Sequence, residues 1–212
     1  MIEQSFSEVF ASALDGAPTV VVGIGDEPMA LPVHLWSRAA DESDHELVAL
    51  CDGPTLDIGC GPGRLTEALA VRGHLALGID VVAAAVAMTA ERGVPAMRRD
   101  VFDQLPGEGR WHTALLADGN IGIGGDPVRL LQRVRALVVP GGRAVVELGG
   151  PGSAVVSCWA ALEGTETRSR PFRWATLGVD DVQHVAAAAG FDSARVHRLG
   201  HRWASVLTEG AA

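Results

Sequence analysis

Two side chains that many enzymes use in catalysis are absent from this chain. Its 212 residues contain no Lys and no Tyr, and all 17 of its basic residues are Arg. A lysine Schiff base, the lysine of a phosphate-binding loop and a tyrosine acid are therefore excluded as parts of its chemistry.

Cysteine and long apolar segments are also scarce. Cys51, Cys60 and Cys158 have neither paired nor metal-type spacing, which favours a reduced intracellular compartment over a disulfide framework. The longest apolar run, Val81 to Met88, is too short to span a bilayer, and the first basic residue is Arg38, so no positively charged signal start is present. We expect a cytoplasmic protein without a membrane partner.

The balance of charge is acidic. A net charge of -9 and a pI near 5.2 argue against an extended nucleic-acid surface, because phosphate binding requires clustered basic side chains. A compact contact with tRNA or protein stays open. The length indicates one domain, with room for a modest cap.

The most informative stretch runs from Thr55 to Leu65. Apolar and β-forming residues lead into glycines at alternate positions (Gly59, Gly61 and Gly63), and helical spacing resumes from Leu65 to Val71. This pattern predicts a strand, a turn that lets a ligand approach the backbone, and a helix.

Strand and helix patterns alternate through most of the chain. Further strands are expected at 75–79, 96–99, 113–117, 143–148, 194–199 and 203–207, and helices at 82–92, 128–138 and 180–189. Alternation predicts an α/β, doubly wound, mostly parallel seven-stranded sheet with helices on both faces. The last two strands are joined only by Gly200-His201, which favours an antiparallel hairpin at one edge.

The N-terminal part is expected to form a short cap. A helix over 2–14 and a hairpin of 19–23 with 29–33 precede a second helix over 41–51, which Asp41, Ser43 or Asp44 can cap. We place residues 1–46 in the cap and 47–212 in the sheet domain. The segment between Gly149 and Thr176 is expected to be irregular.

Acidic residues recur at the carboxyl ends of successive strands, where open α/β sheets bind ligands. Asp57, Asp80 and Asp100 occupy these places, and Asp80 lies 17 positions after Gly63, close to the spacing at which an acid holds a ribose. Arg64 stands where a dinucleotide fingerprint needs its third glycine. Asp57 beside the turn disfavours a phosphate and suits a cation, so a ligand with a ribose and a positive group fits best: S-adenosylmethionine.

Residues 50–208 resemble the class I S-adenosylmethionine-dependent methyltransferases, which have a Rossmann-like fold, and in particular small bacterial members. The resemblance rests on these segments: Leu56-Asp57-Ile58-Gly59-Cys60-Gly61-Pro62-Gly63, Asp80, Asp100-Val101-Phe102, Leu116-Ala117-Asp118-Gly119-Asn120 and 130–142, which ends in Pro140-Gly141-Gly142. It implies a methyltransferase that releases S-adenosylhomocysteine and needs no metal.

The resemblance also implies roles for single residues in binding the cofactor. Gly59, Gly61 and Gly63 would lie along its methionine part, and Asp118 would lie beside the transferred methyl. Asp80, with Val81 beside it, would take the ribose hydroxyls, Asp100 would meet the adenine amino group, and Val101 would pack near the ring. Asp57 completes the set of cofactor-binding residues.

Methyl transfer by in-line attack depends mainly on alignment and exclusion of water. A base is needed only if the acceptor must lose a proton, and Asp118 and His34 are our catalytic candidates, with Glu147 a further acid at a strand end. A lone His such as His34 is also compatible with a purely structural role. Trp36, Trp159, Phe172 and Trp174 are candidates for the wall of the acceptor pocket or for core packing.

Departures from subfamily patterns favour a small-molecule acceptor. The segment after the fourth strand lacks the Pro-Pro-aromatic motif of enzymes that methylate planar nitrogens, and no Cys follows it. Glu147-Leu148-Gly149-Gly150 lacks the Asp-Asn pair of metal-dependent catechol-type enzymes. The alternatives are a noncatalytic S-adenosylmethionine-binding or regulatory module, a protein or tRNA acceptor, and a nicotinamide-dependent reductase, which the missing Tyr and Lys disfavour. The acceptor atom and the oligomeric state stay open.

Overall fold

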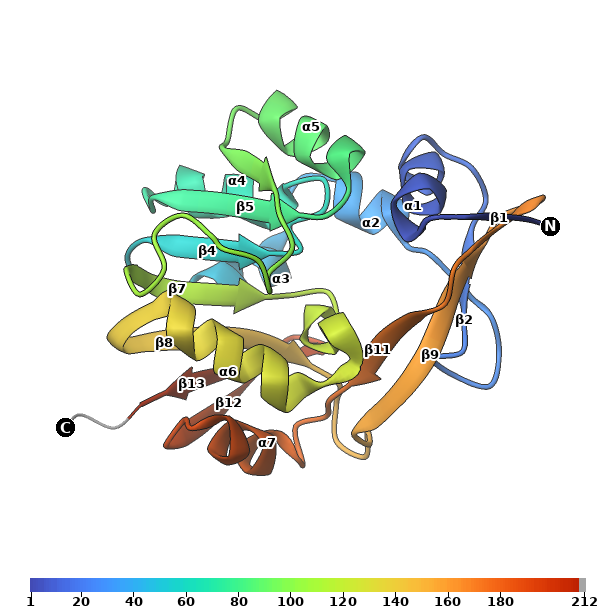
Figure 1. Ribbon diagram of the computed structural model, residues 1–212. Helices are drawn as coiled ribbons and strands as arrows, with labels where there is room; N and C mark the ends of the chain where they lie inside the picture. The colour runs from blue at the N-terminus through green and yellow to red at the C-terminus, as the bar shows by residue number, and fades with distance from the viewer. Residues whose placement is uncertain (210–212) are drawn as a thin grey trace.

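The computed structural model describes residues 1–209, and its main feature is a seven-stranded sheet (Figure 1). In spatial order its strands are β12 (Ser193–Leu199), β13 (Arg202–Thr208), β8 (Val138–Leu148), β7 (Trp111–Leu116), β4 (Thr55–Ile58), β5 (Ala76–Asp80) and β6 (Ala96–Arg98). Strands β8, β7, β4, β5 and β6 pair in parallel, and β13 is antiparallel to both neighbours. The predicted fold class and terminal hairpin are confirmed.

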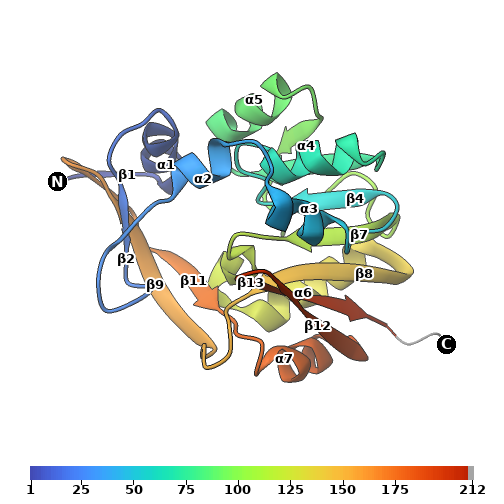
Figure 2. The same cartoon turned by 180° about the vertical axis from the view of Figure 1, so that it is seen from behind.

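Helices cover both faces of this sheet (Figure 2). On one face α6 (Pro127–Leu137) and α7 (Val182–Ala189) belong to one hydrophobic cluster; on the other, α3 (Glu42–Val48) and α4 (Arg64–Val71) belong to a second. Helix α5 (Ala83–Glu91) packs beside α4 against β5 and β6. No helix in the described part of the chain combines the length and apolar character needed to cross a membrane.

The helix boundaries follow from local chemistry. Helix α6 begins at Asp126, whose carboxylate accepts the backbone N–H of Arg129, and Pro127 occupies its first turn. Besides Pro127, its buried residues are Leu130, Leu131, Val134 and Leu137, which form one face of the helix. In α3, Asp41 caps the helix as predicted, through a reciprocal pair with Asp44.

A second sheet lies beyond the carboxyl ends of the parallel strands in both views (Figures 1 and 2). Its strands are β1 (Ile2–Gln4), β10 (Thr167–Ser169), β9 (Val156–Glu163), β2 (Val20–Val22), β3 (Met29–Ala30) and β11 (Phe172–Thr176). Helix α1 (Phe6–Leu14) packs on it, and α2 (Val33–Ser37) follows the hairpin of β2 and β3. The cap therefore combines the N-terminal residues with the segment before α7.

Two predictions about the cap were wrong. The segment from Gly149 to Thr176 is not irregular, because β9 pairs with β2, about 140 residues earlier, and this pairing buries Ala161 and Leu162. The predicted first helix starts only at Phe6, because Ser5 caps it and Ile2–Gln4 pairs with β10. Both differences arise from strand pairing between distant segments, which local periodicity does not reveal. The division of the chain after residue 46 stays a prediction.

Candidate active site

The glycine turn after β4 needs glycine for conformation and for space. Gly59, Gly61 and Gly63 have φ of 72°, 53° and 84°, a region that other residues rarely adopt. A Cβ at Gly59 would lie 2.6 Å from the amide of Asn120, and one at Gly63 would lie 2.6 Å from Thr89. Nothing lies within 4 Å of a Cβ at Gly61. The middle glycine therefore faces open space from which a ligand can approach.

Three side chains from other elements hold this turn. Asn120 Nδ2 donates to the carbonyl oxygens of Ile58 and Gly59, both at 2.9 Å. Thr89 Oγ1 donates to the Gly61 carbonyl at 2.9 Å. Arg92 Nε donates to Pro62 at 2.7 Å, and its Nη2 reaches the Ser37 carbonyl in the cap at 2.6 Å. The sequence analysis named Asn120 only as part of a motif and did not single out Thr89 or Arg92, since nothing local shows that such side chains point to the turn.

Asp80 lies at the end of β5 beside the open glycine. Its Oδ2 accepts the N–H of Gly61 at 3.0 Å, and its Oδ1 accepts the N–H of Val82 at 2.8 Å. Val81, which lies between Asp80 and Val82 in the sequence, is 38% exposed. The carboxylate is thus fixed next to the space above the turn.

Asp100 and Val101 follow β6, the next strand. The Asp100 side chain is exposed, and its Oδ1 accepts the N–H of Phe102 at 2.9 Å, while Val101 is buried. Because β4, β5 and β6 are neighbours, Asp57, Asp80 and Asp100 follow one another along a single edge of the sheet. Their contacts with a ligand stay a prediction.

Asp57 is a buried acid with one short hydrogen bond. It is 2% exposed, and Thr66 Oγ1 donates to its Oδ2 at 2.6 Å. Burial raises the pKa of Asp57 to about 7; the hydrogen bond from Thr66 opposes this, the charge of Asp118 adds to it, and Arg64 opposes it. The carboxyl group therefore titrates near neutral pH.

Replacing Asp57 by asparagine should stabilise the protein at alkaline pH. The raised pKa means that Asp57 keeps its proton in the folded state up to about pH 7, whereas it loses the proton from about pH 4 in the unfolded state. The wild-type fold is therefore most stable, with respect to this group, below about pH 4, and it loses that stability as pH rises through about 7. Asparagine stays neutral and still accepts the bond from Thr66. We expect a gain in the free energy of unfolding of up to about 4 kcal/mol at pH 8.5 and little change at pH 4.

Urea unfolding of both proteins at the two pH values measures this effect. The difference between them cancels the titration of all other groups. An equal difference at pH 4 and pH 8.5 would show that Asp57 does not carry a raised pKa.

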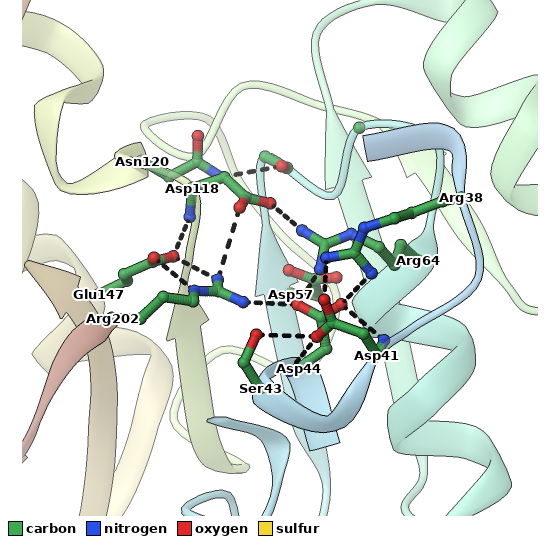
Figure 3. A network of polar contacts seen from close by, with 12 residues as sticks. Arg38, Asp41, Ser43, Asp44, Asp57, Arg64, Asp118, Asn120, Glu147 and Arg202 are labelled. Atoms are coloured by element: carbon green, nitrogen blue, oxygen red, sulfur yellow. Dashed lines mark hydrogen bonds and ion pairs between the residues drawn. The ribbon is translucent and has the colours of Figure 1, made fainter. Parts of the chain in front are cut away.

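A cluster of arginines and acids lies beside the turn (Figure 3). At its centre is Asp44 of α3, which is fully buried and accepts hydrogen bonds from Arg38, Arg64 and Arg202. Burial alone would raise the pKa of Asp44, but the hydrogen bonds from Arg64, the Asp41 backbone and Arg202 hold it well below its usual range. Asp44 therefore remains charged and joins three separate segments.

Asp118, directly after β7, is held from three sides. It has a left-handed φ of 50°, and its N–H donates to Glu147 Oε2 at 2.6 Å. Arg64 Nη2 donates to its Oδ2 at 2.6 Å, and Arg202 Nη2 lies 3.5 Å from its Oδ1. Glu147 in turn accepts two hydrogen bonds of 2.7 Å from the guanidinium group of Arg202. The catalytic candidate is thus already paired with two guanidinium groups.

Sequence reasoning missed this cluster. From the sequence, Arg64 is notable only as the residue in place of a third glycine, and Asp44 only as a possible helix cap. Asp44 and Arg202 are 158 positions apart, and no local signal connects them.

His34, the other catalytic candidate, lies exposed on α2. Within residues 1–209 its ring makes no hydrogen bond or ion pair, with Asp118 or with any other residue. The structure thus places the two candidates on separate elements without linking them.

The cap aromatics pack mainly on one another. Phe10 stacks with Trp36 at 5.8 Å between ring centroids, Phe6 meets Phe172 edge-on at 4.9 Å, and Phe172 meets Trp174 at 6.0 Å. Trp159 is 62% exposed. These contacts favour core packing for Trp36, Phe172 and Trp174.

Comparisons with known proteins agree with this geometry. Residues 55–142 match a family model described as a methyltransferase domain. A trans-aconitate 2-methyltransferase from Paracidovorax citrulli (strain AAC00-1) is 33% identical over 126 residues, which are 54% of this chain and 48% of that protein. The chain thus matches about half the length of this curated relative.

Solved structures share the fold. A SAM-dependent methyltransferase from Bacteroides fragilis, in complex with S-adenosyl-L-homocysteine, has a TM-score of 0.78 at 19% identity, covering 97% of this chain and 94% of the other. The 1,6-didemethyltoxoflavin-N1-methyltransferase of Burkholderia thailandensis has a TM-score of 0.58 at 18% identity, covering 84% and 81%.

Proposed function

We propose that this chain, which contains a methyltransferase domain of the class I S-adenosylmethionine-dependent type, transfers a methyl group from S-adenosylmethionine to a small-molecule acceptor. The observation that carries the proposal is the open face of Gly61 beside the fixed carboxylate of Asp80. The acceptors named for two similar proteins, trans-aconitate and 1,6-didemethyltoxoflavin, are small molecules and support this class.

The residues around the turn fit this cofactor by their chemistry. Asp80 would hold the ribose hydroxyls, Asp100 the adenine amino group and Val101 one face of the ring. The carboxylates of Asp80 and Asp100 at the ends of β5 and β6 suit a ligand with hydroxyl and amino groups and repel phosphates, and Asp57 within β4 adds a buried acid near the turn. Arg64, which directly follows the turn in the sequence, is 3% exposed and already paired with acids.

The protein's part in the reaction is alignment and exclusion of water. Bound S-adenosylmethionine supplies an electrophilic methyl group on a sulfonium. The glycine turn would orient it, the second sheet would cover the carboxyl ends of the strands, and Asp118 would lie beside the acceptor. Where the acceptor must lose a proton, Asp118 or His34 would receive it.

A thermal-shift titration with S-adenosylmethionine and S-adenosylhomocysteine tests the cofactor. At a hundredfold excess over Kd, binding should add about 2.7 kcal/mol to the free energy of unfolding, or roughly 5–10 °C in Tm for a domain of this size. NAD serves as the control and should give no shift. Folded protein that responds to neither sulfur ligand would contradict the proposal, and a shift with NAD alone would favour a reductase.

One observation favours a second candidate, a noncatalytic S-adenosylmethionine-binding module: both arginines beside Asp118 already occupy its carboxylate. Incubation with methyl-labelled S-adenosylmethionine and a cell extract separates the alternatives. We expect label in the small-metabolite fraction. Label in protein or tRNA would identify a macromolecular acceptor, and cofactor binding without any transfer would favour the module.

A further inference from the structure

Asp118 lies on the opposite side of the glycine turn from the residues assigned to adenosine. The neighbours of β4 are β5, which ends at Asp80, and β7, which is followed by Asp118. Asp100 follows β6, farther along on the Asp80 side. A cofactor whose adenosine rests on Asp80 and Asp100 therefore directs its methionine end across the turn toward Asp118. This inference rests on the proposed cofactor site.

The conformation of Asp118 depends on its surroundings. A left-handed φ is uncommon outside glycine, although Asp adopts it more readily than most residues, and contacts with neighbouring groups stabilise it. Here Glu147 accepts a hydrogen bond from the Asp118 N–H, and Arg64 and Arg202 lie against the two carboxylate oxygens of Asp118. Its side chain still keeps 31% exposure, so one part of the carboxylate remains accessible.

Arg202 links three acids of the cluster, Glu147, Asp44 and Asp118. Its side chain is 10% exposed; Nε and Nη2 donate to Glu147 at 2.7 Å, Nη1 donates to Asp44 at 2.5 Å, and Nη2 lies 3.5 Å from Asp118. It is the first residue of β13, so the C-terminal hairpin delivers it to the site. The fork of a guanidinium allows these simultaneous contacts.

We propose that Arg202 is a positioning residue for the methionine end of the cofactor, acting through Glu147 and Asp118. Without Arg202, Glu147 loses the one cation that pairs with it within residues 1–209 and turns from the Asp118 N–H, and Asp118 leaves the left-handed conformation. The adenosine half, held by Asp80 and Asp100 on the far side of the turn, is unaffected.

Calorimetry with two ligands tests this division. S-adenosylhomocysteine carries the amino-acid end, and 5′-methylthioadenosine lacks it. Arg202→Met should weaken binding of S-adenosylhomocysteine at least 10-fold and change binding of 5′-methylthioadenosine less than 2-fold. Arg202→Lys should fall between, because an ammonium cannot form the paired bonds to Glu147.

Two further variants keep the test decisive. The double variant Glu147→Gln with Arg202→Gln removes both charges together, avoids a lone buried charge, and should show the same selective loss even if Arg202→Met does not fold. Arg198→Met is the matched control, because Arg198 is exposed and its guanidinium stacks on Trp203 in the same hairpin without touching these acids. It should bind both ligands as wild type does.

Equal weakening of both ligands would overturn the inference in favour of a general structural role, as would unchanged binding of S-adenosylhomocysteine in the Arg202 variants. Wild-type protein that binds neither ligand would overturn the cofactor proposal itself and the inference with it.

Discussion

Asp80→Asn should weaken S-adenosylhomocysteine binding by about 100-fold while the protein still folds. A carboxylate accepts hydrogen bonds from both ribose hydroxyls, and each bond to a charged group contributes about 1.5–3 kcal/mol; the loss of about 3 kcal/mol corresponds to this factor. The asparagine oxygen can still accept one of the two backbone N–H bonds that Asp80 now receives from Gly61 and Val82. Calorimetric titration measures the change.

The matched control for this experiment is Asp26→Asn. Asp26 is exposed in the turn between β2 and β3, so the variant removes the same charge far from the sheet edge and should bind as wild type does. A loss of less than 3-fold in Asp80→Asn would show that Asp80 does not hold the ribose.

Asp44→Ala should lower the free energy of unfolding by about 3–5 kcal/mol, because it removes the acid that three arginines share and leaves buried cations without their partner. Arg64 is the arginine with the fewest other partners, since its side chain is 4% exposed and, among the described residues, it would keep an ion pair with Asp118 alone. Tm should fall by roughly 10 °C, and urea unfolding at neutral pH gives the free energy directly.

Glu42→Ala provides the comparison for this variant. Glu42 is exposed in the first turn of the same helix, so its loss should change the free energy of unfolding by less than about 0.5 kcal/mol. If Asp44→Ala lost less than about 1 kcal/mol, the cluster would be a solvated set of charges and not a buried network.

The positions of Asp80 and Asp100 were predictable because each depends on a neighbouring stretch of chain. An apolar run that ends in an acid and is followed by a helical pattern places Asp80 at the carboxyl end of a parallel strand, and Asp100 directly follows the next predicted strand, 96–99. The ligand roles of these residues remain proposals, since position alone does not show a contact.

Asp44 and Arg202 illustrate what local patterns cannot show. An acid in the first turn of a helix has the same sequence environment whether it faces water or three arginines. Its burial depends on which segments the folded chain brings against it, and Arg202 arrives from the last strand.

Local sequence patterns were enough to predict the strand, glycine turn and helix after Thr55, the alternation that builds a mostly parallel sheet, and the closing hairpin. Each of these depends on the periodicity or backbone freedom of adjacent residues. Three features became visible only in the folded molecule: β9 pairs with β2 to complete the cap, Asn120 and Thr89 hold the glycine turn, and Arg202 closes the ion cluster around Asp118. Such contacts join side chains far apart in the sequence, and their partners are fixed by packing of the whole domain.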